Sequence, residues 1–578
     1  MAADGRIRVL RVLKHPITAS LLLAAALHLL WLAVFASSGG DLAAQDAWAE
    51  FAEQHPDSAY NMAWYGGMHP VSYSVMSPYL MALLGVRTTV IIAGTLSAGL
   101  LALILVRSPV RRPMVPALWG AFALTCNAAS GRATFAIGVL FALGAVAVVW
   151  AWPLAWRRRW RWARGALAAL LAGLATAGSP VAGLFLWVVA GGLFLGRRRA
   201  AAFSLALTPP LVVACSALLF PFKGVQPMPF VSVAFPVIGA VAVALFAPRE
   251  WRTVRLGAWV YGIGVLLTWL IPSQVGSNVE RLSLLFGGVV LLAVMRTTRV
   301  RWRSRTGVVL VASFVVIAGW TIGKPTYDIA VTTPAAAWTR DVTPLLEQLE
   351  RVHADRARVE VVPVSSHREA SALAPHVNLA RGWNRQADTD RNPLFYDGSL
   401  TPERYHDWLR RWAVHYVVLP RTERPDISAR EEAELVRGGL PFLEEVWSDR
   451  HWTLYRVADA LPLADPPAEV ERATANEVTV TVREAGAVLM RIPWSPWLSL
   501  VDGDGERLLP PKEMAGNEHG CLRPAPPSVG ADGDPPPEGD EADGVPVDRW
   551  TLLEAPKPGT YRIGAPYKLP RGTQCPDA

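Results

Sequence analysis

Two acidic residues, Asp41 and Asp46, stand shortly after the first long apolar run of the chain, which covers residues 17–35. A carboxylate at a membrane–water interface can act as a general base on a sugar hydroxyl. Asp41 is also a suitable N-cap for the helix predicted to follow it. Both interpretations remain open. The length of the loop that carries the two acids, residues 36–87, favours a functional one.

Residues 60–70 of the same loop are dense in aromatic side chains and glycines, and they include Trp64, Tyr65 and His69. Aromatic rings commonly stack on sugar faces, and glycine lets a backbone approach a ligand closely. An aromatic belt at the membrane interface would have the same composition. His69 taken alone is more typical of a hydrogen-bonded structural residue than of an acid or base. These residues are candidate substrate contacts, with the interfacial belt as the alternative.

Arginines occur in two further loops predicted on the same side as the acidic loop. Arg132 ends a very tight turn between two apolar runs, and Arg281 ends a second connection that also contains Asn278. A guanidinium matches the oxygens of a lipid phosphate, so these residues are candidates for binding a donor phosphate. The alternative is that each arginine anchors a helix end at the membrane surface.

A polar and aromatic cluster lies in the C-terminal half, where residues 379–398 contain Arg381, Trp383 and Tyr396. Loops of this kind often carry binding residues. The segment would also suit a structured loop that docks onto the rest of the protein. We treat the three residues as candidate substrate contacts.

Other signatures of catalysis are missing from the sequence. There is no GxGxxG, Walker or HExxH pattern, and no CxxC or Cys/His cluster for a metal. Cys126 and Cys215 lie in apolar runs and suit inert core thiols. Cys521 and Cys575 can form one disulfide if their domain is extracytoplasmic. No cofactor is predicted, although a divalent cation beside Asp41 remains open.

The first elements that must position these residues are membrane-spanning helices, which are predicted from long apolar runs. The chain is 52% hydrophobic and 18% charged, and the apolar runs fill residues 17–322. Residues 166–196 are too long for one simple span and are interrupted at 178–180, which predicts two short helices or a re-entrant hairpin. About eleven crossings are expected. The other predicted spanning runs are 17–35, 88–106, 114–130, 133–153, 201–220, 230–247, 255–272, 282–296 and 306–323.

Basic clusters between the runs set the predicted orientation. Most of the net charge of +8 lies in these clusters, so they form the positive-inside pattern rather than a face for nucleic acid. The N-terminal run resembles a signal peptide but is long enough to span, and we expect it to remain as the first helix. The N-terminus is predicted in the cytoplasm and the C-terminal domain outside. The clusters cover 6–14, 107–112, 157–164, 197–199, 249–255 and 296–305.

The soluble part is predicted to follow a membrane bundle formed by residues 1–323. Residues 324–465 alternate helical and strand patterns, which indicates a small α/β domain. Residues 466–578 contain short strands and many Pro and Gly turns, which indicates a β-sandwich. Within it, residues 531–548 are acidic and rich in Pro and Gly, and we expect a disordered insertion there.

This arrangement resembles the GT-C superfamily of membrane glycosyltransferases, in which acidic residues follow the first helix, as Asp41 and Asp46 do here. The resemblance extends to enzymes of the mycobacterial arabinofuranosyltransferase type, and the composition also looks actinobacterial. The resemblance implies that a sugar is transferred at the outer face of the plasma membrane. The donor would be a polyprenyl-phosphate-linked sugar, and the acceptor a cell-envelope glycan or glycolipid. Asp41 would be the general base, and Arg132 or Arg281 would lie near the donor phosphate.

Two other classes of protein remain. Many spans and a broken run also suit a transporter or flippase of a lipid-linked or cell-envelope substrate. The spans contain almost no ionisable residues, however, and coupled transporters usually place such groups at midplane. A non-catalytic scaffold that binds cell-wall polymer is the third class. A scaffold should tolerate mutation of the acids in the first loop.

Overall fold

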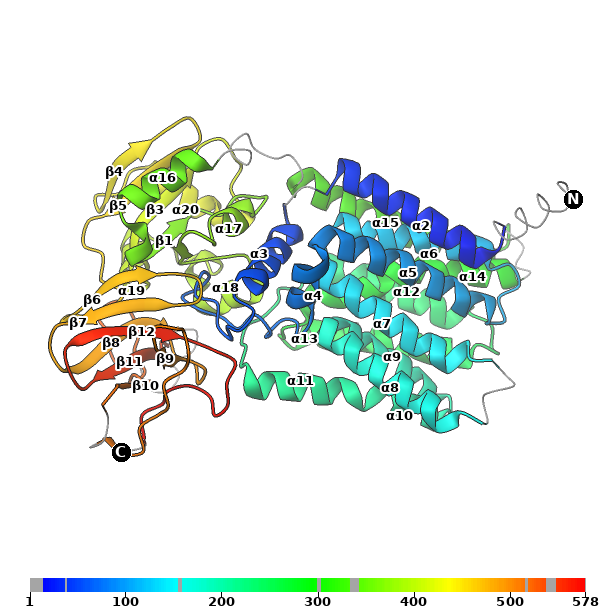
Figure 1. The fold of residues 1–578 in the computed structure, drawn as a ribbon. Helices are drawn as coiled ribbons and strands as arrows, with labels where there is room; N and C mark the ends of the chain where they lie inside the picture. The colour runs from blue at the N-terminus through cyan, green and yellow to red at the C-terminus, as the bar shows by residue number, and fades with distance from the viewer. Residues whose placement is uncertain are drawn as a thin grey trace, which may run out of the picture. The chain divides into compact units, whose positions relative to one another are not determined.

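The computed structural model describes residues 14–36, 39–153, 159–298, 303–332, 342–514, 518–536 and 547–576. The chain divides into two compact units (Figure 1). The bundle unit consists of Met1–Ser37, Val71–Pro221 and Val225–Thr333. The sheet unit consists of Ser38–Pro70, Phe222–Gly224 and Pro334–Ala578. The first loop is therefore divided between the two units, and both predicted acids belong to the sheet unit.

The bundle unit is built from helices that run alongside one another (Figure 1). Among the described residues, seven helical segments are long and apolar enough to cross a membrane, and three shorter apolar helices accompany them. The predicted count of eleven crossings is not confirmed. The helices are α2 (Pro16–Val34), α4 (Ser77–Leu84), α5 (Val86–Val106), α6 (Met114–Ala129), α7 (Ala133–Trp150), α8 (Arg161–Gly178), α9 (Pro180–Leu195), α10 (Arg199–Ala206), α11 (Thr208–Leu219), α12 (Val231–Phe246), α13 (Arg252–Leu270), η2 (Gly276–Glu280), η3 (Ser283–Gly287), α14 (Gly288–Thr297) and α15 (Arg305–Thr332).

Small residues lie between the helices and large apolar ones point outward. A Cβ atom added at Gly192 of α9 would lie 3.0 Å from the backbone of Gly257 on α13. Close approach of this kind is how helices associate in lipid, where apolar burial supplies little force. Leu29, Leu218 and Leu270 are each more than half exposed. An apolar exterior on long apolar helices identifies a multi-pass membrane protein.

Two segments show how the predicted boundaries compare with the structure. The long run 166–196 breaks at Ser179, whose extended backbone separates α8 from α9. The final helix passes the predicted boundary at 323 and continues to Thr332. Lys324 and Asp328 form an ion pair of 2.6 Å one turn apart on this extension. Such i,i+4 ion pairs stabilise a helix where it continues beyond the apolar part of its sequence.

A five-stranded sheet forms the first part of the sheet unit, in the order β2-β1-β3-β5-β4. Strands β2, β1 and β3 are parallel, whereas β5 and β4 are antiparallel. The predicted α/β domain is thus present. Its strands are β1 (Arg358–Val361), β2 (Asn378–Leu379), β3 (Val414–Pro420), β4 (Leu443–Ser448) and β5 (Trp452–Val457), and its helices are α16 (Thr343–Arg351), α17 (Arg368–Ala372), α18 (Arg385–Arg391), α19 (Pro402–Arg411) and α20 (Arg430–Arg437).

The first loop is an integral part of this sheet unit. It begins with α3 (Asp41–Gln54), which packs on α17. Farther along, Trp64 pairs in parallel with Leu379 of β2, and the Leu379 amide donates to the Ala63 carbonyl at 2.8 Å. The loop therefore extends the edge of the parallel sheet.

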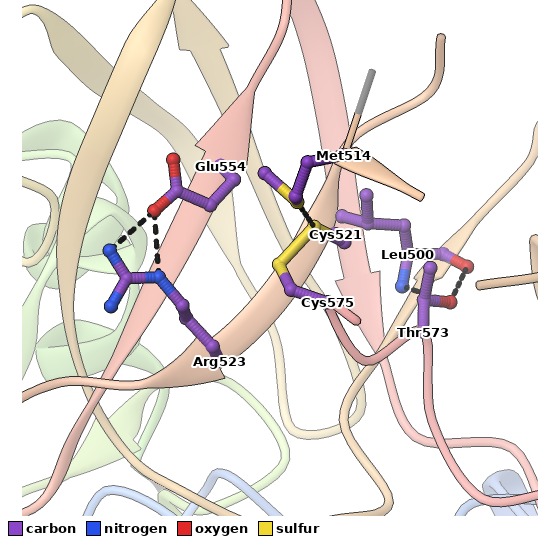
Figure 2. Close-up of a disulfide and its surroundings, with 7 residues drawn as sticks. All are labelled: Leu500, Met514, Cys521, Arg523, Glu554, Thr573 and Cys575. Carbon is purple, nitrogen blue, oxygen red and sulfur yellow. Dashed lines mark hydrogen bonds and ion pairs between the residues drawn. A yellow bond between two sulfur atoms is a disulfide. The ribbon is translucent and has the colours of Figure 1, made fainter. Parts of the chain in front are cut away.

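Two further sheets, ordered β10-β11-β8 and β6-β7-β12-β9, form the predicted β-sandwich. Cys521 and Cys575 form a disulfide across 54 residues of sequence (Figure 2). Residues 537–546 of the predicted disordered insertion lie outside the described residues. The strands are β6 (Ala468–Ala473), β7 (Val478–Val482), β8 (Gly486–Pro493), β9 (Ser499–Val501), β10 (Cys521–Pro524), β11 (Trp550–Ala555) and β12 (Gly559–Gly564).

Asp548, at the end of the predicted insertion, is ordered. Its carboxylate is buried and accepts hydrogen bonds of 2.5 and 2.7 Å from the Arg411 guanidinium. An ion pair with hydrogen bonds at both oxygens fixes this end of the segment against α19. The expectation of disorder is therefore wrong for Asp548.

Candidate functional site

The parallel strands of the sheet unit bring three loops to one edge. The loops after β1, β2 and β3 cover residues 362–367, 380–384 and 421–426, and all three leave from the carboxyl ends of their strands. Strand β1 lies between β2 and β3, so the chain order reverses beside it. In open α/β sheets, ligands bind outside the carboxyl ends of the strands at such a reversal. This edge of the sheet is therefore the candidate site.

His367 and Asp426 face each other across the reversal. The Nε2 atom of His367 lies 3.4 Å from Oδ1 of Asp426, and its Nδ1 atom lies 3.7 Å from Oε1 of Glu369. The Trp383 ring stacks on the imidazole with centroids 3.4 Å apart and planes 9° apart. Loops from all three parallel strands therefore meet at one histidine.

The electrostatics of the pair favour its charged form. Burial by itself lowers the pKa of His367, but the neighbouring carboxylates of Asp426 and Glu369 outweigh burial, and the pKa of His367 lies above its usual value. Burial likewise tends to raise the pKa of Asp426, but His367 and Arg385 hold it far below its usual value. Opposite charges in contact stabilise each other's ionised state. Both shifts favour an imidazolium beside a carboxylate at this site.

Arg385 connects this pair to the next loop. Its guanidinium donates to Asp426 at 3.0 Å and to the Tyr396 hydroxyl at 3.0 Å, and it lies 5.0 Å from the centre of the Trp383 ring. Tyr396 in turn donates to Asp388 at 2.5 Å. Trp383 and Tyr396 are only partly buried. Both side chains therefore keep part of their surface exposed at the edge where a ligand would bind.

Arg381 lies at the centre of a buried network of charged side chains and is almost completely buried itself. It donates to Asp388 and Glu432 at 2.8 and 2.9 Å, and only 3% of it is exposed. Glu360 lies 3.8 Å away, and burial together with the nearby Glu432 carboxylate raises its pKa well above the usual value. Arg381 thus fixes the loop that carries Trp383.

Asp41 lies at the N-terminus of α3, next to this edge. The amide of Gly40 donates to the carbonyl of Ser366, the residue before His367, at 2.7 Å. Gly40 is the N-cap, with a φ of 62°, and Asp41 is the first residue of the helix. The capping interpretation of Asp41 is therefore not what the structure shows, and its half-buried carboxylate belongs to the first turn.

The two predicted acids lie on different faces of α3. Five residues of an α-helix turn through a net angle of about 140°. Asp41 shares a face with Gln45 and Trp48, both buried, and the Trp48 ring packs edge-on against Trp64 at 5.1 Å. The Oε1 atom of Gln45 is buried and has no hydrogen-bond partner among the described residues. Asp41 therefore lies on the face that packs into the sheet unit.

Asp46 lies on an acidic stripe with Glu50 and Glu53. Burial, then the charges of Asp46 and Glu53, raise the pKa of Glu50. Like charges spaced four residues apart destabilise a helix unless something compensates for them. Only Asp41 of the two acids shares a helix face with the residues packed at the sheet.

The aromatic segment of the first loop is buried in the sheet unit. The Trp64 indole donates to Ala370 at 3.0 Å and the Tyr65 hydroxyl donates to Gly382 at 2.9 Å, and each side chain is at most 1% exposed. His69 is bonded to the Ala59 carbonyl at 2.7 Å, and burial lowers its pKa to about 4. These three residues hold the loop in place, which sets the position of α3.

The arginines predicted to bind phosphate lie in the bundle unit, where the structure brings them to one helix end. Arg132 is the N-cap of α7, and the guanidinium of Arg281 lies 5.3 Å from the ring of Phe135, which is in the first turn of α7. Arg132 is 3.7 Å from the carboxylate of Asp328. Asn278 is buried in η2, which leads to Arg281. Two cations and a helix N-terminus make a suitable environment for an anion.

Two polar atoms without a hydrogen-bond partner in the part of the chain that the structure describes lie near the arginine cluster formed by Arg132 and Arg281. The Oδ1 atom of Asn127 and the Oγ atom of Ser130 are buried near the end of α6 and have no hydrogen-bond partner among the described residues. Buried polar groups usually have a partner, so each exception asks for an explanation. A bound ligand with hydroxyl groups would supply one.

The sequence reasoning missed His367 and Asp426, and it did not select Arg385 and Asp388 as site residues although both lie in the predicted polar segment 379–398. Each follows or precedes an element that the pattern of residues predicted only roughly, and no motif marks them. The available signal was their position after buried parallel strands. Among the described residues, no group of three or more His, Cys, Asp or Glu side chains could hold a metal ion.

Comparisons with known proteins add a family and two structures. A family described as a domain of unknown function, DUF8823, matches residues 465–578, the β-sandwich. No curated protein matches the chain. The mycobacterial arabinofuranosyltransferase AftD is 16% identical with a TM-score of 0.43, over 76% of this chain and 40% of AftD. The oligosaccharyltransferase AglB of Archaeoglobus fulgidus, solved with an inhibitory peptide and a dolichol-phosphate, is 12% identical with a TM-score of 0.41, over 70% of this chain and 69% of AglB.

This chain thus spans less than half the length of AftD. Both TM-scores lie below 0.5, so the likeness by itself assigns no activity to this chain.

Proposed function

We propose that this protein is a membrane glycosyltransferase that moves a sugar from a polyprenyl-phosphate donor to a cell-envelope glycan or glycolipid acceptor. The observation that carries the proposal is the hydrogen bond from Gly40 to Ser366, because it brings Asp41 to the carboxyl edge of a parallel sheet. A partly exposed tryptophan and tyrosine, Trp383 and Tyr396, lie at that edge. The two structures named above belong to proteins that transfer glycosyl groups, but the argument here rests on the residues.

Asp41 acts as the general base in this proposal. Its carboxylate takes the proton of an acceptor hydroxyl, and the acceptor oxygen forms a bond to the anomeric carbon of the sugar. The bond between that carbon and the phosphate oxygen breaks, and polyprenyl phosphate leaves with the electron pair. Asp46 is the less suitable base, because it lies about 140° around α3 from Asp41.

The donor phosphate is assigned to the bundle unit. Arg132 and Arg281 supply positive charge, with Asn278 as a neighbouring amide. Guanidinium–phosphate hydrogen bonds are charge-assisted and stronger than neutral ones. The same charges stabilise the phosphate as it leaves, since its negative charge grows during the reaction.

The acceptor is assigned to the sheet unit. Trp383 and Tyr396 are the candidate aromatic residues that are partly exposed, so we assign the acceptor contacts to them. Trp64, Tyr65, His69 and Arg381 are buried, and we assign them the positioning of those rings and of α3. Loss of one of these positioning residues should lower activity because the rings and α3 would no longer be held in place.

An extracytoplasmic location of the sheet unit completes the proposal. The Cys521–Cys575 disulfide supports it, because disulfides persist in oxidising compartments. The basic clusters between the apolar runs support the same orientation through the positive-inside rule.

The test is transfer of labelled sugar from a synthetic polyprenyl-phosphate donor in membranes that contain the Asp41→Asn variant. A lost general base lowers the rate by roughly 10²–10⁴-fold. Glu53→Gln is the matched control, because Glu53 is an exposed acid on the same helix. Asp46→Asn should have a smaller effect than Asp41→Asn. Undiminished transfer by Asp41→Asn would rule out its assignment, and a scaffold or flippase would show no transfer in any variant.

A further inference from the structure

The bundle unit contains a cavity that the proposed reaction does not use. Its volume is about 640 Å³, and it lies among α5, α7, α9, α12, α13 and α14. Cavities of about 300–1,000 Å³ are typical of sites for small molecules. The walls are mainly apolar side chains, including Leu101, Val139, Phe185, Val243 and Val289. The space suits hydrocarbon rather than water.

The cavity reaches about halfway through the bundle. Arg252, the first residue of α13, lines one end, and Tyr261 on the same helix lines the other. Nine residues of an α-helix rise about 14 Å, which is roughly half of the 30 Å hydrocarbon core of a bilayer. Its depth therefore matches a single leaflet.

The open end of the cavity is the basic end of the bundle. Arg198 and Arg252 line it together with Glu250, and all three side chains are exposed. Trp150 also lines this end and lies 5.7 Å from the Arg198 guanidinium. Helices α5, α7 and α9 all end here, beside the basic clusters predicted to face the cytoplasm. The two arginines outnumber the glutamate, so this end favours an anion.

The inner end of the cavity carries one polar atom without a partner. The Oγ atom of Ser283 is buried and has no hydrogen-bond partner among the described residues, whereas the Tyr261 hydroxyl donates to the Val279 carbonyl at 2.8 Å. The charged side chains that line the cavity are all at the open end. An amphiphile with an anionic head and apolar chains complements this distribution.

We infer that this cavity binds one anionic phospholipid of the membrane, with its acyl chains between the helices and its phosphate beside Arg198 and Arg252. Each Lys or Arg near the membrane surface favours an anionic lipid by roughly fivefold, so two arginines select for anionic over neutral lipids by roughly thirtyfold. The lipid is a separate ligand from the polyprenyl-phosphate donor, and its binding does not depend on the proposed transfer reaction.

The experiment supplies the purified full-length protein, stripped of lipid, with equal amounts of phosphatidylglycerol, phosphatidylcholine and polyprenyl phosphate. Lipid retained per protein is then counted by mass spectrometry. We expect one phosphatidylglycerol per chain. Gly257→Leu should abolish its retention, because a Cβ at Gly257 meets only the Val188 carbonyl, at 3.8 Å, and the side chain has room to enter the cavity. Gly264→Leu on the same helix is the control, since nothing lies within 4 Å of its added Cβ.

The arginines give a second test that does not alter the packing. Replacing Arg198 and Arg252 together by Gln should lower phosphatidylglycerol retention by roughly thirtyfold and remove the preference over phosphatidylcholine. Arg249→Gln, an exposed neighbour outside the cavity, should leave both unchanged. Equal retention by the Gly257→Leu and Gly264→Leu variants would overturn the proposal. So would equal retention of the two phospholipids by the wild type, or recovery of polyprenyl phosphate in their place.

Discussion

At the scale of single residues, the two candidate acids of α3 lie among different groups of side chains. Asp41 heads the face of α3 that carries the buried Gln45 and Trp48, while Asp46 belongs to the acidic stripe. The sequence alone favoured Asp41 over Asp46 only because Asp41 lies nearer to the first apolar run. The helix face of each acid could be predicted once the first residue of α3 was known. That start is set by Gly40, whose amide donates a hydrogen bond to Ser366, and Ser366 is too distant in sequence for this contact to be predicted.

Arg281 gives a prediction about donor binding. Arg281→Gln removes a guanidinium from the arginine cluster at α7, and a charge-assisted hydrogen bond is worth about 1.5–3 kcal/mol. The donor KM should therefore rise by roughly tenfold or more, with a smaller change in kcat, in steady-state transfer assays. Arg296→Gln, at the end of α14, is the control. An unchanged donor KM in the Arg281 variant would remove this residue from the phosphate site.

His367 gives a prediction about pH. Because its folded pKa is raised, its contribution to stability is fully present below the unfolded value of about 6.5 and is lost as pH rises through the folded pKa. His367→Gln should lower stability by about 1.5–3 kcal/mol at pH 6, and by less at pH 9. Thermal unfolding of the detergent-purified protein, followed by tryptophan fluorescence at both pH values, measures the difference. A loss that is equal at the two values would contradict an ionised His367–Asp426 pair.

At the scale of elements, composition and period predicted the architecture well. Apolar runs predicted the helical bundle, and alternating patterns predicted the α/β domain and the β-sandwich. Sequence reasoning did not predict that residues 39–70 would form part of the sheet unit, because this depends on the pairing of Trp64 with Leu379 across more than three hundred residues. The count of eleven crossings was not confirmed because a run of apolar residues fixes hydrophobicity but not helix length.

The glycines of the first loop test its place in the sheet unit. Gly67 has a φ of +138°, and an added Cβ would lie 2.0 Å from the Tyr60 ring. Gly67→Ala should destabilise the protein by more than 2 kcal/mol, since it adds a buried clash to backbone strain. Gly398→Ala is the matched control, because Gly398 also has a positive φ, of +72°, but nothing within 4 Å of the added atom. Equal melting temperatures for the two variants would show that residues 60–67 are not packed as described.

At the scale of the whole molecule, the account requires the sheet unit to lie outside the cell. The disulfide and the basic clusters both favour this orientation. In a variant lacking Cys126 and Cys215, a cysteine placed at Glu484, in the exposed turn after β7, should react with an impermeant maleimide in intact cells. A cysteine placed at Arg111, between α5 and α6, should react only after the membrane is opened. The reverse pattern would invert the predicted topology.

The central claim is that the protein transfers a sugar from lipid to acceptor, with Asp41 as base. The most direct measurement reconstitutes the full chain with a labelled polyprenyl-phosphate sugar and an envelope acceptor, and counts glycosylated acceptor and released polyprenyl phosphate together. The account predicts equal amounts of the two products in the wild type and a loss of both by at least about a hundredfold in Asp41→Asn. Donor that crosses the membrane with its sugar still attached, or transfer that persists in Asp41→Asn, would contradict it.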